Sequence, residues 1–122
     1  IANAVEQGLI TSGVMHACVT KGVPFVLCGS IRDDGPLPDV ITDSVKAADT
    51  MREHVLDVAV AIVVATTLHG VATGNMLPAS VLTFTVDTSA DNVIKRVDRG
   101  THQAVGIVTD CEYFLSSLAR HL

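Results

Sequence analysis

The sequence is poor in aromatic and charged residues. Aromatic side chains make up 3% of its 122 residues, tryptophan is absent, and charged residues reach only 17%. The 8 lysines and arginines stand against 13 acidic residues, and they form no basic cluster. Nucleic-acid binders need clustered cations that displace counterions. A nucleic-acid partner is therefore not expected.

Cysteine pairs and long hydrophobic runs are also lacking. Cys18, Cys28 and Cys111 form no CxxC pair, so neither a disulfide framework nor a metal site is expected. The longest apolar stretch, from Val58 to Leu68, is too short to cross a bilayer. No signal-peptide pattern is present at the N-terminus. We expect a soluble, cytoplasmic protein with no membrane contact.

What the sequence does contain is enough apolar material for a packed core. Hydrophobic residues make up 48% of the chain, and its length suits one domain spanning residues 1–122. The first residue is Ile1 rather than Met, and it lies within a helix-like pattern. We expect a piece of a longer protein, lacking its N-terminal part.

Short apolar runs alternate with segments of helical spacing. The expected strands are Val23 to Cys28, Val58 to Val64, Val81 to Val86 and Ala104 to Val108. The expected helices are Ala2 to Thr20, Thr42 or Asp43 to Leu56, Thr66 to about Gly74, Ser89 to Arg99 and Asp110 to His121. Strands separated by such helices form right-handed crossovers and a parallel sheet. The predicted fold is α/β, Rossmann-like and three-layered (α/β/α), with about four strands in a mainly parallel sheet.

In such sheets, ligands bind at the edge where the strands end. The first strand is followed by Gly29, Ser30, Ile31, Arg32, Asp33 and Asp34. Glycine lets backbone amides approach an anion, and Arg32 can pair with a phosphate or a carboxylate. An ordinary turn, with Arg32 neutralised by Asp33 or Asp34, explains the same residues equally well.

His69 follows the second strand and is flanked by Gly70. An imidazole at a strand exit can donate to a cofactor or move a proton, although a structural histidine is the more common case. Gly74 and Asn75 further along fit either a binding loop or a helix C-cap.

Asp87 directly follows the third strand. An acid there accepts hydrogen bonds from the adenosine ribose in dinucleotide-binding folds, and capping the next helix is the alternative. Asp110 after the fourth strand is best explained as a helix N-cap, and Cys111 as a small packing residue. No GxGxxG, GxxxxGK[ST] or GxSxG motif is present.

The chain resembles the archaeal-type ornithine cyclodeaminase family, which carries the conserved region of the bifunctional lysine-ketoglutarate reductase and saccharopine dehydrogenase. The resemblance rests on VPFVLCGSIRDDGPLPDVITD, TTLHGVATGNMLPA, VDTSADNVIKRVDRG and QAVGIVTD, and covers nearly the whole chain. It implies a Rossmann-like domain that binds NAD and an enzyme that converts ornithine to proline and ammonia. The bound NAD would take up a hydride from the substrate and return it later, so it is recycled.

The resemblance also implies roles for particular residues and partners. Cofactor binding is expected from Gly29, Ser30, Ile31, Arg32, Gly74, Asn75, Met76 and Asp87, with proton transfer by His69, Asp33 or Asp34. The expected partners are an amino-acid substrate, the missing N-terminal part of the protein and further copies of it in a homo-oligomer. A non-catalytic nucleotide-binding or assembly domain and an NAD-dependent amino-acid dehydrogenase are the alternatives.

Overall fold

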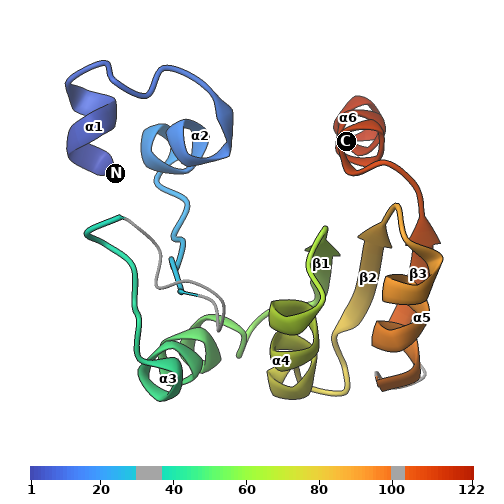
Figure 1. Cartoon of the computed structure of the whole chain (residues 1–122). Coiled ribbons are helices and arrows are strands. Elements are labelled where there is room, and N and C mark those ends of the chain that lie inside the picture. Colours follow the sequence, from blue (N-terminus) through green and yellow to red (C-terminus); the bar gives the residue numbers. More distant parts are fainter. Residues whose placement is uncertain (30–36, 100–103) are drawn as a thin grey trace. The chain divides into compact units, whose positions relative to one another are not determined.

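The computed structural model describes residues 1–29, 37–99 and 104–122 (Figure 1). The chain divides into two compact units, Ile1–Thr50 and Met51–Leu122. The parallel sheet lies in the second unit, and each unit is described by itself below.

The first unit begins with two helices rather than the one expected. Helix α1 spans Ala2–Glu6 and helix α2 spans Gly13–Lys21. The prediction of one continuous helix was wrong because the backbone between them turns through Gly8, whose φ is +70°, a conformation that glycine adopts without strain. The predicted end at Thr20 lies one residue before the observed end at Lys21, where Gly22 caps α2 in the left-handed conformation.

The run from Val23 to Cys28 was predicted as a strand, and this was wrong. Its pairing in the described residues is one isolated parallel bridge between Cys28 and Ile41, in which Ile41 N–H donates to the Leu27 carbonyl at 2.9 Å. Pro24 offers no N–H to a ladder, and Val23 and Phe25 are exposed. The apolar pattern alone was therefore not sufficient to form a strand, because in the described residues this run has a single bridge instead of a ladder of pairs with a neighbouring strand.

Helix α3 spans Ser44–His54 and crosses from the first unit into the second. Of the two caps expected for it, the structure selects Asp43, whose Oδ1 accepts the N–H groups of Val45 and Lys46, both at 2.9 Å. This satisfies two donors of the first helical turn that have no partner within the helix.

The second unit contains a parallel sheet in the order β1-β2-β3, formed by β1 (Val60–Val64), β2 (Leu82–Asp87) and β3 (Ala104–Val108). Helices α4 (Leu68–Met76) and α5 (Ala90–Arg99) connect the strands, and α6 (Cys111–His121) follows β3. The parallel α/β arrangement and three of the four expected strands are confirmed. Helix α4 runs two residues further than expected.

One face of the sheet packs against α4 and α5, which lie in front of it in Figure 1. Val63, Thr85 and Gly106 are neighbours in register on this face. A Cβ on Gly106 would lie 2.4 Å from Cγ1 of Val93 in α5, closer than real contacts allow. Glycine is therefore required here, because α5 packs directly against the backbone of β3.

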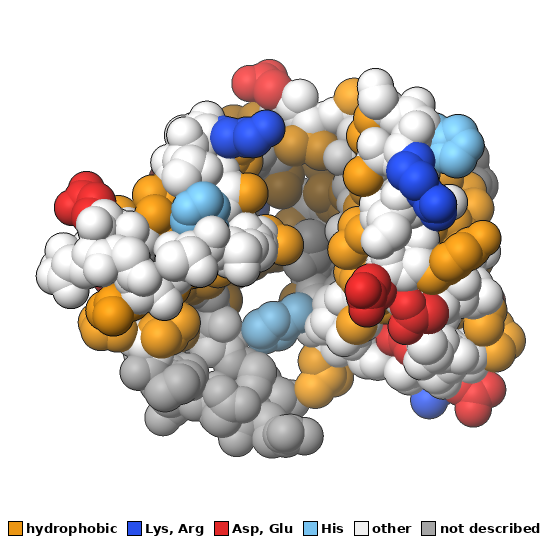
Figure 2. All heavy atoms as spheres, turned by 90° about the horizontal axis from the view of Figure 1, so that it is seen from above, with side chains coloured by type: hydrophobic (Ala, Val, Ile, Leu, Met, Phe, Trp, Pro, Cys, Tyr) orange, Lys and Arg blue, Asp and Glu red, His pale blue; other side chains and the backbone are white. Residues whose placement is uncertain are grey.

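The opposite face of the sheet is apolar and partly exposed, although Val86 near its carboxyl end is fully buried. Its side chains are exposed by 40 to 50% at four positions, Val60, Ile62, Leu82 and Val105. Strands of parallel sheets are apolar throughout because both faces are normally covered. Hydrophobic side chains are also visible at the surface in the view of Figure 2. Among the described residues, no helix combines the length and apolarity needed to span a membrane.

Candidate nucleotide site at the carboxyl ends of the strands

The three strands of the second unit end at the same edge of the sheet. Ala65, just after β1, donates its N–H to the Val86 carbonyl of β2 at 3.0 Å. Thr109, just after β3, donates to the Asp87 carbonyl at 3.0 Å. The three strand exits are thus tied to one another, and this edge is where open parallel sheets bind ligands.

The exit of β1 turns sharply into α4. Ala65 has a φ of +49°, and among the described residues it is the only non-glycine residue with a positive φ. Helix α4 begins at Leu68 after the N-cap Thr67, whose side chain makes no capping hydrogen bond. The first-turn amides of a helix are polarised donors, which makes this turn suitable for an anionic group.

Three residues of this turn have the spacing of the dinucleotide fingerprint G-x-G-x-x-G. Ala65, Thr67 and Gly70 stand at its first, third and sixth positions. The first glycine of the fingerprint allows a tight turn, and the last allows close packing of helix on strand. Here Ala65 makes the turn with a positive φ, and a Cβ on Gly70 would lie 2.8 Å from Cγ1 of Val63 in β1. Two features that the fingerprint assigns to its first and last glycines, a tight turn and close packing of helix on strand, are therefore present here although two of the three glycines are replaced.

Asp87 stands at the end of β2, about 20 residues after this turn, as the acid of the fingerprint does. It is buried, with 8% of its surface exposed. Its Oδ1 accepts the N–H of Ser89 at 2.9 Å, and its Oδ2 accepts Nη2 of Arg96 at 3.0 Å. Asp87 thus forms an Asx turn with Ser89. The capping role weighed as its alternative is filled by Ser89, whose Oγ accepts the N–H of Asn92 in α5.

These contacts keep Asp87 ionised. The hydrogen bond from Ser89 lowers the pKa of its carboxyl group most, the charge of Arg96 lowers it further, and burial opposes both. The side chain of Asn92 also hydrogen-bonds to Asp87 and lowers its pKa. A carboxylate can accept about four hydrogen bonds, so these three protein donors leave capacity for one ligand hydroxyl.

Arg96 of α5 is the partner that the sequence analysis did not identify. It is 5% exposed, and its Nη1 donates to the carbonyl of Thr66 in the β1 exit. Its Nε donates to the Asn92 carbonyl within α5 at 3.0 Å. The sequence did indicate that Arg96 is unusual, because position 96 lies on the same helix face as Val93 and Val97, where a cation is unexpected.

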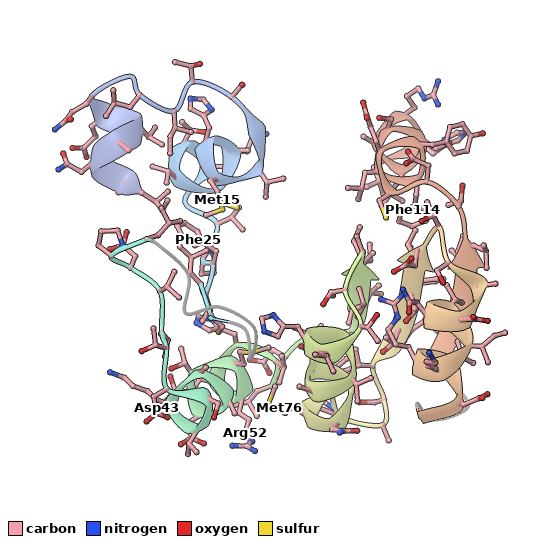
Figure 3. The ribbon with its side chains drawn as sticks, viewed as in Figure 1. Met15, Phe25, Asp43, Arg52, Met76 and Phe114 are labelled. Atoms are coloured by element: carbon pink, nitrogen blue, oxygen red, sulfur yellow. The ribbon has the colours of Figure 1, made fainter. Side chains whose placement is uncertain are left out.

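The residues predicted as site residues are not all brought together. His69 is exposed in the first turn of α4, at the same edge as Asp87. Gly74, Asn75 and Met76 form the last turn of α4, at the end away from the strand exits, and Figure 3 labels Met76 there. Since α4 has nine residues, its ends are separated by about 12 Å.

The predicted loop after Cys28 belongs to the first unit. The N–H of Gly29 donates to the Ile41 carbonyl at 2.9 Å. Ser30, Ile31, Arg32, Asp33 and Asp34 lie outside the described residues, so their predicted roles stay predictions. In the described ranges, no three His, Cys, Asp or Glu side chains gather in a metal-binding arrangement.

The exit of β3 is a simple helix cap. Asp110 is exposed, and its Oδ1 accepts the N–H of Tyr113 at 2.9 Å. This confirms the N-cap interpretation. Sγ of Cys111 lies 3.8 Å from the Val86 carbonyl, so the thiol faces the end of β2.

Comparison with known proteins identifies close relatives along the whole chain. The sequence is 53% identical over 122 residues to ornithine cyclodeaminase from Methanothermobacter thermautotrophicus, covering all of this chain and 30% of that protein. It is 46% identical to the bifunctional arginine dihydrolase/ornithine cyclodeaminase AgrE of Nostoc sp., covering 17% of that protein. The chain thus spans less than a third of the length of these curated relatives.

Solved structures share the fold. The ternary complex of AgrE with ornithine and NAD⁺ matches with a TM-score of 0.89 at 45% identity, over 99% of this chain and 18% of that one. A conserved LOR/SDH protein from Methanococcus maripaludis matches with a TM-score of 0.89 at 50% identity, over 99% of this chain and 37% of that one. A family model described as arginine dihydrolase ArgZ-like, C-terminal, Rossmann fold matches residues 1–118. The chain therefore belongs to the ArgZ-like C-terminal Rossmann-fold family.

Proposed function

We propose that this chain is the NAD-binding portion of an ornithine cyclodeaminase-like enzyme, which converts ornithine to proline and ammonia. The proposal is supported by relatives that carry this activity in their names and by the AgrE complex with ornithine and NAD⁺. The observation that carries it is the β1-α4-β2 unit, in which Ala65, Gly70 and Asp87 have the geometry of a dinucleotide fingerprint.

Each part of this unit has a role in the proposal. The first-turn amides of α4 donate to the pyrophosphate, and the remaining acceptor position of Asp87 receives an adenosine ribose hydroxyl. A bound NAD supplies a hydride acceptor for oxidation of the substrate amine. His69 is proposed as a proton-transfer residue, since it lies in the first turn of α4, at the same edge of the sheet as Asp87.

Other predicted contacts belong to different parts of the site. We keep Gly29, Ser30, Ile31 and Arg32 as a proposed phosphate loop, and Asp33 and Asp34 as proposed proton-transfer residues. Gly74, Asn75 and Met76 stay a prediction for a separate subsite, since the length of α4 lies between them and Asp87. Substrate recognition is assigned to the rest of such an enzyme.

A binding experiment tests the nucleotide site. NAD is titrated by calorimetry into the full-length protein, as wild type and as the Asp87→Ala, Asp87→Asn and Asp110→Ala variants. Both Asp87 variants are expected to bind at least about tenfold more weakly, the scale of a lost hydrogen bond to a charged group. Asp110→Ala is the matched control and should bind as wild type does. Unchanged affinity in both Asp87 variants would sink the ribose assignment.

An activity measurement separates the proposed reaction from its alternatives. The full-length protein is incubated with ornithine and a small amount of NAD, and proline, ammonia and NADH are quantified. Proline and ammonia in excess over NAD support a cyclodeaminase with recycled cofactor. Accumulation of NADH in proportion to product would instead indicate a dehydrogenase. Bound NAD without any product would indicate a nucleotide-binding or assembly domain.

We also propose that the enzyme is a homo-oligomer and that it is cytoplasmic. The first proposal is supported by the open apolar sheet face and by β1, which forms an edge of the sheet within the described residues. Light scattering of the full-length protein after size-exclusion chromatography is the test. A mass equal to one chain would contradict oligomerisation. The cytoplasmic location stays a prediction from composition.

A further inference from the structure

The guanidinium of Arg96 joins three segments of the second unit. It donates to Asp87 at the end of β2, to the carbonyl of Thr66 after β1, and to the carbonyl of Asn92 in its own helix. Each of its three nitrogens therefore has a protein acceptor. With its side chain 3% exposed, it is not available as a direct ligand for a phosphate.

The contact with Asp87 limits where that carboxylate can lie. The Asx turn from Ser89 engages Oδ1, and Arg96 engages Oδ2. With both oxygens held, the carboxyl plane has a defined orientation before any ligand arrives. Binding sites gain affinity when a group is already ordered in this way, because less conformational freedom is lost on binding.

The contact with Thr66 orients the neighbouring peptide. A trans peptide is planar, so its C=O and N–H point in opposite directions. Because the Thr66 carbonyl is directed at Arg96, the N–H of Thr67 is directed away from it. Arg96 therefore sets the direction of an amide in the turn proposed to meet the pyrophosphate.

The fold makes room for this arginine at Gly70. A Cβ on Gly70 would lie 3.1 Å from Cδ of Arg96, in addition to its conflict with Val63. The close approach of α4 to β1 and to Arg96 depends on the same glycine. The turn after β1 and the side chain of Arg96 are thus packed as one arrangement.

We propose that Arg96 is a positioning residue for the nucleotide. It orients the Asp87 carboxylate and the 66–67 peptide toward the two halves of the adenosine diphosphate moiety without touching the ligand. This rests on the proposed NAD-binding function. It predicts that removing Arg96 impairs recognition of the ribose hydroxyl specifically, beyond any loss of stability.

The test compares NAD with 2′-deoxy-NAD, an analogue that lacks the adenosine 2′-hydroxyl. Both are titrated into the full-length wild type and the Arg96→Met, Arg96→Lys and Arg120→Met variants, below their unfolding temperatures. Arg120 is the matched control, since its Nε donates to the Ser116 carbonyl just as that of Arg96 donates within α5. Among the described residues, this hydrogen bond of Arg120 stays within α6 and involves neither Asp87 nor Thr66.

Wild type and Arg120→Met are expected to prefer NAD to the analogue by about tenfold, the scale of one hydrogen bond to a carboxylate. Arg96→Met should bind NAD more weakly and lose most of this preference. Arg96→Lys keeps the charge but not the planar fork, and should retain an intermediate preference. If Arg96→Met fails to fold, Arg96→Lys carries the comparison.

The outcomes separate this inference from the proposed function. A wild type that binds NAD, with variants that keep the full preference for NAD over the analogue, overturns the positioning role and leaves NAD binding intact. A wild type that binds no NAD overturns both. A loss of preference in the Arg96 variants alone supports the inference.

Discussion

The exits of β2 and β3 carry the same local sequence feature and have different structures. Each strand is followed by a helix, and each exit has an aspartate that accepts a backbone N–H at 2.9 Å. Asp110 is exposed and caps α6. Asp87 is buried and also paired with Arg96, which reaches on to the exit of β1.

The difference shows that the role of a strand-exit aspartate depends on what the next helix places beside it. Helix α5 packs against the sheet through Val93 and carries Arg96 to the edge. For α6, the contact of Asp110 is local to its own helix turn. One exit is thus a buried hydrogen-bonded cluster and the other a helix start, although the two look alike in sequence.

The largest effect is expected from removing the cation on the Asp87 side. Arg96→Met leaves a buried carboxylate without its partner and should lower the free energy of unfolding by about 3 kcal/mol. Arg120→Met, the control on α6, should change it by less than about 0.5 kcal/mol. Urea denaturation of both variants is the measurement. Equal losses would erase the distinction between the two exits.

A smaller loss of stability is expected on substitution of Gly70, whose missing side chain lets α4 pack closely against β1 and Arg96. Gly70→Ala introduces a Cβ 2.8 Å from Val63 and should cost about 1–3 kcal/mol of stability through overpacking. Gly74→Ala in the same helix meets nothing within 4 Å, and should be neutral or stabilising by up to about 1 kcal/mol. Thermal unfolding distinguishes the two, and a stable Gly70→Ala would argue against the close packing.

Asp110→Ala tests whether the aspartate at the exit of β3 serves only as a helix cap. Loss of the N-cap should reduce stability by about 1 kcal/mol, while the affinity for NAD stays unchanged because, in the described part of the chain, the side chain of Asp110 bonds within the first turn of α6. Chemical denaturation and NAD titration of the same preparation check both statements. A weakened NAD affinity would show that the third strand exit also belongs to the site.

The backbone at Ala65 provides a finer test of the β1 turn. Ala65→Gly relieves a positive φ and should change stability by no more than about 0.5 kcal/mol. Ala61→Gly within β1 should cost about 0.5–1 kcal/mol, because glycine loses more freedom in a strand than alanine does. Thermal unfolding of the two variants compares their stabilities. A large loss of stability in Ala65→Gly would contradict a left-handed turn at position 65.

The smallest effect is the dependence of stability on pH through Asp87. Hydrogen bonding to Ser89 and then pairing with Arg96 lower the pKa of this carboxyl group, and burial partly offsets them. Its stabilising contribution is complete above about pH 4, the unfolded pKa, and is lost as the pH falls through the lower folded value. Asp87→Asn should therefore show a weaker loss of stability on acidification than wild type in denaturant titrations. Identical slopes would contradict the shifted pKa.

Part of the fold was predictable because its signals are local. Continuous apolar runs between helical segments identified β1, β2 and β3 nearly to the residue. The same signal was wrong for Val23 to Cys28, because a strand exists only where neighbouring backbone pairs with it. The break between α1 and α2 at Gly8 was also missed, since the side-chain periodicity continued across it.

The site was predictable to a lesser extent. Asp87 could be singled out because an acid at the end of a strand is recognisable along the chain, and its role toward a nucleotide stays a prediction. The turn at Ala65 was missed because alanine and threonine stand where the motif has glycines, and only the positive φ reveals the resemblance. The prediction for Gly74, Asn75 and Met76 is untested, but α4 carries them away from the strand exits.

By itself, the sequence determined the class of the fold, the succession of helices and strands from α3 to α6, and the family resemblance, because apolar periodicity and residue spacing are properties of the chain. Only the tertiary structure decided which polar residues act together. Arg96, Asp87 and Thr66 are brought into contact by parallel strand pairing and the packing of α5 on the sheet. Their mutual hydrogen bonds, formed in a buried place, distinguish an organised strand exit from an ordinary helix cap.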